Sequence, residues 1–280
     1  MFSFFKKKTA PVWQYQSTGF IWRMLFSASN AVVIENRIKE TRTVNFNCLD
    51  LSNGKEIWRN FSLDEPWFVG LEAVHQGKVF LHGYFDPNLP EHLGIYCVHA
   101  ESGNLLWYNK DISYFYFADG LVFAYQDDAT GRTYLSIDAE TGKTVENFGR
   151  DNTIPESKRE LYPEFEGYND VRFSDKMDSQ HPQFNDMQIL IGKFISQIDL
   201  TFGIDYLDLG EHVIFGVYHR TNDQKMSYSM LWIESRTAEA KINEVIASEV
   251  SGQVGDLFFV KQNQLITIKN RNMLQVYSIA

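Results

Sequence analysis

Two carboxylates, Glu72 and Asp205, fall on segments that have the pattern of inner strands of a sheet. Paired carboxyl groups that face each other across a cleft are the apparatus of glycoside hydrolysis, where one donates a proton and the other acts as base or nucleophile. Residues so far apart in the chain show no spacing from which such a pair could be recognised. They define the catalytic alternative for this protein, a hydrolase acting on a carbohydrate-like substrate.

The other side chains that could perform chemistry lack the spacing of a known site. The seven histidines form neither a His-x-x-x-His motif nor a zinc site with cysteines. Four of them fall in one stretch: His75, His82, His92 and His99. We expect turns and the alternation of side chains along strands to separate these four. Asp127-Asp128 with Gly131 fits a hydrated turn better than a calcium loop. The sequence therefore predicts no metal site and no cofactor.

The two cysteines, Cys48 and Cys97, each stand ten residues before a tryptophan, Trp58 or Trp107. The same spacing places them at equivalent positions of two repeats, where the Cα atoms of neighbouring repeats are too far apart for a disulfide. We predict two buried free thiols that serve packing.

A repeat must position all of these residues. Residues 49–58 (LDLSNGKEIW) return as 98–107 (VHAESGNLLW) and as 137–146 (IDAETGKTVE). The repeated glycines Gly54, Gly103 and Gly142 are 49 and 39 residues apart, which is the period of a propeller blade. We expect these glycines to adopt positive φ in hairpin turns.

Short β-rich runs separated by Gly and Asp turns precede and follow each repeat, four runs to a unit. The sequence predicts an all-β fold, a β-propeller of four-stranded antiparallel blades. Five blades are expected, with six as the alternative, in a single domain over residues 1–280. Residues 11–15 contain Trp13 and are predicted to pair with the C-terminal strand and so to close the ring. Trp13, Trp58 and Trp107 are expected to pack between blades.

Residues 151–200 interrupt this pattern. They carry ten acidic and five basic residues, half of the net charge of −10. Apolar residues at helical spacing predict one short helix within residues 184–195. We interpret the segment as an acidic insertion, a solvated loop on one face of the propeller.

The repeat, an acidic or polar residue followed by Ser/Thr/Asn-Gly and then Trp, resembles that of quinoprotein-type (PQQ-like) β-propellers. The chain also looks like an uncharacterised bacterial family of propeller-like proteins. The resemblance implies the fold rather than an activity, because the related dehydrogenases have larger rings, a calcium ion and adjacent cysteines. A PQQ-dependent dehydrogenase is therefore not expected.

Inner strands of a propeller surround its central channel, and a ligand is expected at the mouth of that channel. Besides Glu72 and Asp205, five residues are candidates for contact with a polar ligand or a peptide: Arg23, Trp67, Tyr114, Tyr116 and Tyr206.

The net charge of −10 argues against nucleic acid as a partner, because phosphate binding needs clustered Lys and Arg. Apolar stretches fall short of the roughly 20 residues of a membrane helix. We predict a cytoplasmic monomer without enzymatic activity, a binding or scaffolding propeller that contacts a protein or a polar small molecule.

Overall fold

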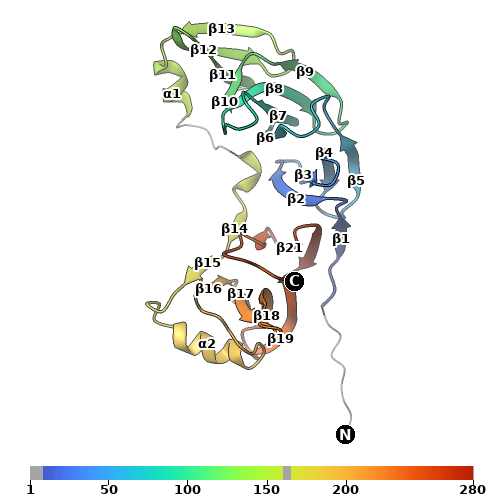
Figure 1. The fold of residues 1–280 in the computed structure, drawn as a ribbon, viewed down its shortest axis with the longest axis vertical. Coiled ribbons are helices and arrows are strands. Elements are labelled where there is room, and N and C mark those ends of the chain that lie inside the picture. The colour runs from blue at the N-terminus through green and yellow to red at the C-terminus, as the bar shows by residue number, and fades with distance from the viewer. Residues whose placement is uncertain (1–8, 160–164, 280) are drawn as a thin grey trace. The chain divides into compact units, whose positions relative to one another are not determined.

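The structure, a computed structural model, describes residues 9–159 and 165–279. It is all-β, with five antiparallel sheets of four or five strands (Figure 1). The chain divides into two compact units. Unit 1 comprises Met1–Ser17 and Asp170–Ala280, and unit 2 comprises Thr18–Asn169.

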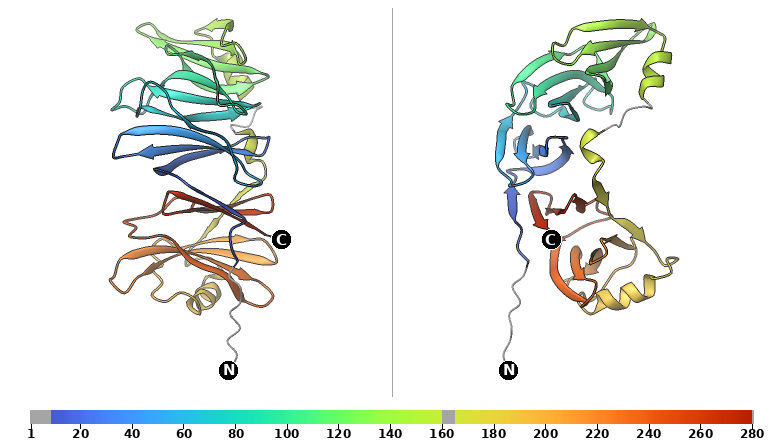
Figure 2. Two further views of the ribbon diagram at one scale, coloured as in Figure 1. Left: turned by 90° about the vertical axis from the view of Figure 1, so that its right-hand side faces the viewer. Right: turned by 180° about the vertical axis from the view of Figure 1, so that it is seen from behind.

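Unit 2 contains three four-stranded sheets, each formed by strands that are consecutive in the chain, and the sheets stack in chain order (Figure 2). The first holds β2 (Phe20–Phe26), β3 (Ala31–Ile38), β4 (Thr43–Asp50) and β5 (Glu56–Phe61). The second holds β6 (Val69–His75), β7 (Lys78–Tyr84), β8 (His92–His99) and β9 (Leu105–Asn109). The third holds β10 (Ser113–Ala118), β11 (Leu121–Asp128), β12 (Gly131–Asp138) and β13 (Thr144–Gly149). Each sheet has the strand order predicted for a blade.

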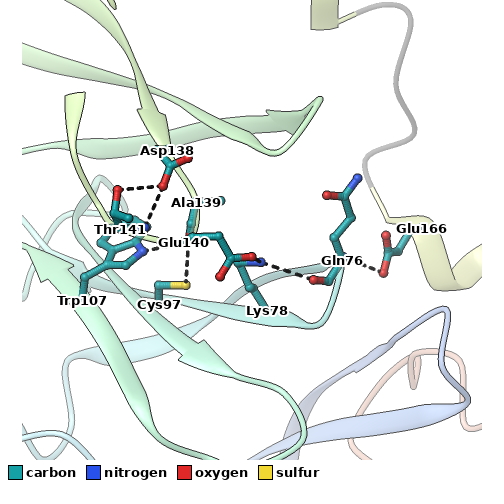
Figure 3. Close-up of polar contacts among 9 residues, drawn as sticks. All are labelled: Gln76, Lys78, Cys97, Trp107, Asp138, Ala139, Glu140, Thr141 and Glu166. Carbon is teal, nitrogen blue, oxygen red and sulfur yellow. Dashed lines mark hydrogen bonds and ion pairs between the residues drawn. The ribbon is translucent and has the colours of Figure 1, made fainter. Parts of the chain in front are cut away.

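The repeated tryptophans and glycines join neighbouring sheets of unit 2. Trp58 Nε1 donates to the carbonyl of Ala100 at 2.7 Å. Trp107 Nε1 donates to the carbonyl of Ala139 at 2.9 Å, as Figure 3 shows. A Cβ on Gly103 would lie 2.8 Å from the Trp58 ring, and one on Gly142 would lie 2.7 Å from the Trp107 ring. Each indole therefore packs on the glycine turn of the next sheet, as the repeat predicts.

The same register explains the cysteines. Cys48 pairs across the sheet with Trp58, and Cys97 pairs with Trp107, so a small side chain stands beside each indole. Both thiols are free and buried, as predicted. Burial raises the pKa of each thiol to about 12. Because the thiolate is the reactive form, these cysteines are packing residues at neutral pH.

Unit 1 contains two five-stranded sheets, with the orders β1-β22-β21-β20-β14 and β15-β16-β17-β18-β19. The first is formed by β1 (Trp13–Gln16), β22 (Met273–Ser278), β21 (Gln264–Lys269), β20 (Phe258–Lys261) and β14 (Val171–Phe173). The second is formed by β15 (Asp175–Met177), β16 (Ile204–Asp208), β17 (His212–Arg220), β18 (Met226–Glu234) and β19 (Glu239–Ala247). The predicted pairing of the N-terminal and C-terminal strands is confirmed, since Trp13 lies opposite Val276.

Residues 151–200 do more than form a surface loop. Helix α1 (Thr153–Arg159), a 3-10 turn η1 (Glu166–Tyr168) and helix α2 (Phe184–Gly192) lie here, α2 inside the range where the sequence predicts a helix. β14 and β15 each add a strand to a sheet of unit 1. The sequence analysis missed these strands because each is only three residues long. Among the described helices, neither is long and apolar enough to cross a membrane.

Candidate functional site

Glu72 stands on a β-bulge in the first strand of the second sheet. The pairing of β6 with β7 shifts register between Leu71 and Ala73, so Glu72 is the extra residue on β6. A bulge breaks the alternation of side chains and re-aims the residue that it carries. The first strands of the other two sheets of unit 2 also shift register, at Trp22 in β2 and at Phe115 in β10.

Charged side chains from the first sheet hold this bulge. Arg23 Nη1 donates to the carbonyl of Leu71 at 2.8 Å, and the amide of Leu71 donates to Glu35 Oε2 at 2.8 Å. Glu35 is only 1% exposed and accepts a second bond from Arg37 Nε at 2.7 Å. Arg37 also donates to the carbonyl of Val69 at 2.7 Å. The backbone beside Glu72 is therefore fixed on both of its polar groups.

Two histidines meet the carboxylate of Glu72. His82 Nδ1, from β7, lies 2.7 Å from Glu72 Oε2, and His92 Nδ1, from β8, lies 2.8 Å from the same oxygen. The two imidazoles stack with ring centroids 3.4 Å apart and planes 8° apart. The three ligand atoms lie within 4.8 Å of one another. We call Glu72, His82 and His92 the Glu72 cluster.

The hydrogen bonding of His82 is incomplete. The residue is 4% exposed, and neither of its ring nitrogens has a hydrogen-bond partner of good geometry among the described residues. The contact to Glu72 is thus close but not aligned as a hydrogen bond. Buried polar groups of folded proteins are paired in most cases, so an orphaned imidazole points to a ligand.

Neighbouring residues determine where each ring lies. A Cβ on Gly70 would lie 2.6 Å from His82 Nε2, so the glycine provides the space for that ring. Tyr84 stands edge-on to both imidazoles, with centroids 5.3 Å from each. Ser113 Oγ, from the third sheet, donates to the carbonyl of His92 at 2.7 Å. The His92 side chain remains 34% exposed, which leaves the cluster open on that side.

The electrostatics keep the cluster ready to accept a cation. Burial by itself would raise the pKa of Glu72, but the close contacts and charge of His82 and His92 lower it to about 2. Burial lowers the pKa of His82 and outweighs the contact and charge of Glu72, which raise it. An ionised carboxylate therefore lies beside two imidazole rings whose Nδ1 atoms are close to it.

The expectation that strand alternation separates the histidines is wrong for His82 and His92. His92 lies opposite Tyr84, two residues from His82 on the same strand, so the two rings are diagonal neighbours on one face. The bulge then turns Glu72 toward them. The sequence signal for this cluster was a pair of histidines on adjacent strands of a predicted hairpin. The bulge that turns Glu72 toward them cannot be recognised in the sequence.

The other predicted ligand contacts of unit 2 occupy varied environments. Arg23 supports the bulge, as described above. Trp67 stacks against Arg37, whose Cζ lies 5.3 Å from its ring centroid. Tyr114 is partly buried against Phe80. Tyr116 is buried and stacks on Phe123 with centroids 4.5 Å apart.

Asp205 and Tyr206 lie on β16 of unit 1. Asp205 contacts Lys176 Nζ, and Tyr228 Oη donates to Asp205 Oδ2 at 2.6 Å. Lys176, Asp205 and Tyr228 form what we call the Asp205 cluster. A Cβ on Gly216 would lie 1.8 Å from Tyr228 Oη, so this glycine provides the space for the hydroxyl group. Tyr206 packs near His181, with centroids 5.8 Å apart.

Comparison with known proteins adds a family match and distant structural likenesses. A family described as Domain of unknown function (DUF4905) matches residues 26–107, which contain the whole Glu72 cluster. No curated protein is significantly similar in sequence.

Among solved structures, the uncharacterized protein lmo1340 from Listeria monocytogenes EGD-e is 10% identical with a TM-score of 0.37, over 96% of this chain and 97% of that one. The β-propeller domain of the Trilobed protease from Pyrococcus furiosus is 10% identical with a TM-score of 0.31, over 95% and 72%. A eukaryotic initiation factor is 8% identical with a TM-score of 0.35, over 94% of this chain and 52% of that one. The chain thus spans about half the length of that initiation factor.

Proposed function

We propose that this protein is a non-catalytic binding module and that its ligand is held by the Glu72 cluster. The observation that carries the proposal is the convergence of one carboxylate and two imidazole nitrogens on the second sheet of unit 2. The orphaned nitrogens of His82 and the open side at His92 support a bound partner that is small and polar.

The charge state of Glu72 argues against one role in the hydrolase alternative, that of the acid. A glycosidase acid must be protonated near neutral pH, which requires a raised pKa. The pKa of Glu72 is instead lowered to about 2, so its carboxyl group is ionised and suited to holding a ligand.

One observation in unit 1 favours the hydrolase alternative. Burial, together with the charge of Asp205, raises the pKa of Asp256. A carboxyl group with a raised pKa is suited to the role of the acid in a hydrolytic pair. The alternative function is therefore hydrolysis of a carbohydrate-like substrate by Asp205 and Asp256, replacing the pair of Glu72 and Asp205 expected from sequence. Turnover of a panel of glycosides that is lost in Asp205→Asn would favour it.

The proposed frame is a propeller of five blades over residues 1–280, closed by β1 pairing with β22. The blade-like strand order of the sheets and the packing of Trp58 and Trp107 on the next glycine turn support this proposal. The same packing supports the relation to quinoprotein-type repeats. We propose that a protein partner would contact the acidic residues of 151–200. Deleting this segment is not a suitable test of that contact, because β14 and β15 lie in it and each is a strand of a five-stranded sheet.

A thermal-shift screen of the full chain tests the binding proposal. The panel contains metal ions, pyrroloquinoline quinone, sugars and nucleotides. A ligand at 100 times its dissociation constant stabilises a protein by about 2.7 kcal/mol. We expect at least one compound to raise the Tm of the wild type by about 5 °C and to leave the Tm of Glu72→Gln unchanged. A shift that persists in Glu72→Gln would place the ligand elsewhere.

A further inference from the structure

Resting on the proposed function, we infer that the ligand of the Glu72 cluster is a divalent transition-metal cation such as Zn²⁺. It is bound through Glu72 Oε2, His82 Nδ1 and His92 Nδ1. These three atoms belong to adjacent strands of one sheet and lie within 4.8 Å of one another.

The donor set identifies the class of ion. Imidazole nitrogen suits Zn²⁺ and its first-row neighbours, whereas Ca²⁺ and Mg²⁺ take oxygen ligands, six or more in the case of Ca²⁺. Two imidazoles and one carboxylate are a common set of three protein ligands for zinc, with a fourth position left to water or to another small ligand. The exposed side of His92 provides access for that fourth ligand.

The distances allow an ion after a small movement. With metal-to-ligand distances of about 2.1 Å, the ligand atoms of a tetrahedral site are about 3.4 Å apart. Here Glu72 Oε2 lies 2.7 Å and 2.8 Å from the two histidine nitrogens. Separation by about 0.6 Å is therefore required. His92 is the half-exposed member of the cluster and can supply this movement, while His82 stays against Gly70.

The orphaned state of His82 is an independent observation that points to the same ion. Both ring nitrogens are buried without a hydrogen-bond partner among the described residues. A cation at Nδ1 would give this nitrogen a partner and would compensate the ionised Glu72. It would also explain why two imidazoles stack 3.4 Å apart with both Nδ1 atoms within 2.8 Å of one carboxylate oxygen.

Metal ligands must be deprotonated, and metal affinity falls where they are not. The free thiols Cys48 and Cys97 are buried with a raised pKa of about 12, so they do not compete for the ion.

Titration of the full, tag-free chain with Zn²⁺ by calorimetry, and with Co²⁺ by its visible d–d absorption, tests the inference. We expect one equivalent of each ion to bind, with nitrogen ligation visible in the Co²⁺ spectrum. Glu72→Gln and His92→Gln should weaken binding at least about 100-fold, more than the loss of an outer partner causes. His99→Gln is the matched control, because His99 lies on the same strand and contacts Ser102 outside the cluster. Its affinity should stay within about twofold of the wild type.

The urea midpoint of each variant without metal checks that the variant is folded. Binding of Zn²⁺ that is unaffected by Glu72→Gln and His92→Gln would overturn the inference. Failure of both ions to bind, with a sugar or nucleotide still giving a shift that depends on Glu72, would overturn the metal assignment and leave the proposed function standing. No response to any compound would overturn both.

Discussion

The Glu72 cluster and the Asp205 cluster have similar frameworks but differ in the groups that contact the carboxylate. Each places a carboxylate on a strand of a sheet, and in each a glycine makes room for the group that contacts this carboxylate. The glycine is Gly70 on β6 itself in the first cluster, and Gly216 on β17, the strand paired with β16, in the second. Asp205 receives a Lys176 ammonium group and a Tyr228 hydroxyl group, so both of its oxygens have donors. Glu72 faces two imidazoles through one oxygen, and the nitrogens of His82 have no hydrogen-bond partner within residues 9–159 and 165–279.

The difference separates a structural carboxylate from one that is available to a ligand. A buried polar group that is fully paired stabilises its surroundings, and removing one partner costs the desolvation of the other. A group left short of partners costs stability unless something binds it. We therefore expect changes around Asp205 to act on folding and changes around Glu72 to act on binding.

Gly216→Ala should have the largest effect on stability. Its Cβ would lie 1.8 Å from Tyr228 Oη, 2.5 Å from Tyr228 Cζ and 2.7 Å from Phe258 Cε1, all inside the core of unit 1. Overpacking of this kind costs about 3 kcal/mol or more, because the ring has no space into which to move. Urea unfolding measures it, with Gly192→Ala as control since a Cβ there meets nothing within 4 Å. A loss below about 1 kcal/mol would mean that Tyr228 is not held as described.

The free energy of unfolding should decrease at acid pH as the carboxylate of Glu72 is protonated. The pKa of this group falls from 4.5 to about 2 on folding, because the contacts of His82 and His92 outweigh burial. Its stabilisation is therefore complete above pH 4.5 and is lost as the pH falls toward 2. The full difference corresponds to about 3 kcal/mol.

Urea unfolding of the wild type and of Glu72→Gln between pH 7 and pH 3 tests this dependence. The wild type should lose stability more steeply below pH 4.5 than the variant does. Parallel profiles would show that the two histidines do not stabilise the ionised carboxylate. Asp205→Asn serves as the control and should retain the steep fall that is due to Glu72.

Asp205→Ala should cost about 2 kcal/mol, because the buried Tyr228 hydroxyl group then loses its acceptor. Tyr228→Phe removes the donor instead and leaves Asp205 in contact with Lys176, so it should cost less. The double variant should be no worse than Asp205→Ala alone. Strict additivity of the two single changes would show that the pair does not interact.

The sequence predicts the strands of the sheets well, and for a physical reason. Gly54, Gly103 and Gly142 adopt φ near 70° in their turns, a conformation that favours glycine, so the repeat marks each turn. Alternating apolar runs between such turns leave few other arrangements. β14 and β15 could not be predicted, because strands of three residues show no period.

The site was only half predictable. The sequence analysis singled out Glu72 because its segment was predicted to be an inner strand, but it assigned the residue a catalytic role. The sequence analysis did not predict His82 and His92 as part of a site, because regular alternation along the strands would separate the histidines. The register shift between Leu71 and Ala73 brings them together, and Arg23 and Glu35 contact Leu71 at this shift from another sheet. Contacts between sheets of this kind cannot be predicted from the local pattern of polar and apolar residues in the sequence.

Gly70→Ala should have the smallest effect on stability, but it tests most directly whether the Glu72 cluster and the Asp205 cluster differ in metal binding. Its Cβ would lie 2.6 Å from His82 Nε2, the far end of a side chain that can turn, so the loss should be about 1 kcal/mol. The turned ring would take Nδ1 away from Glu72, and the response of the Tm to Zn²⁺ should fall with it. Gly216→Ala, by contrast, should lower the Tm and keep the Zn²⁺ response. If Gly70→Ala keeps the full Zn²⁺ response, His82 is not one of the metal ligands. The two clusters would then differ only in their residues and not in metal binding.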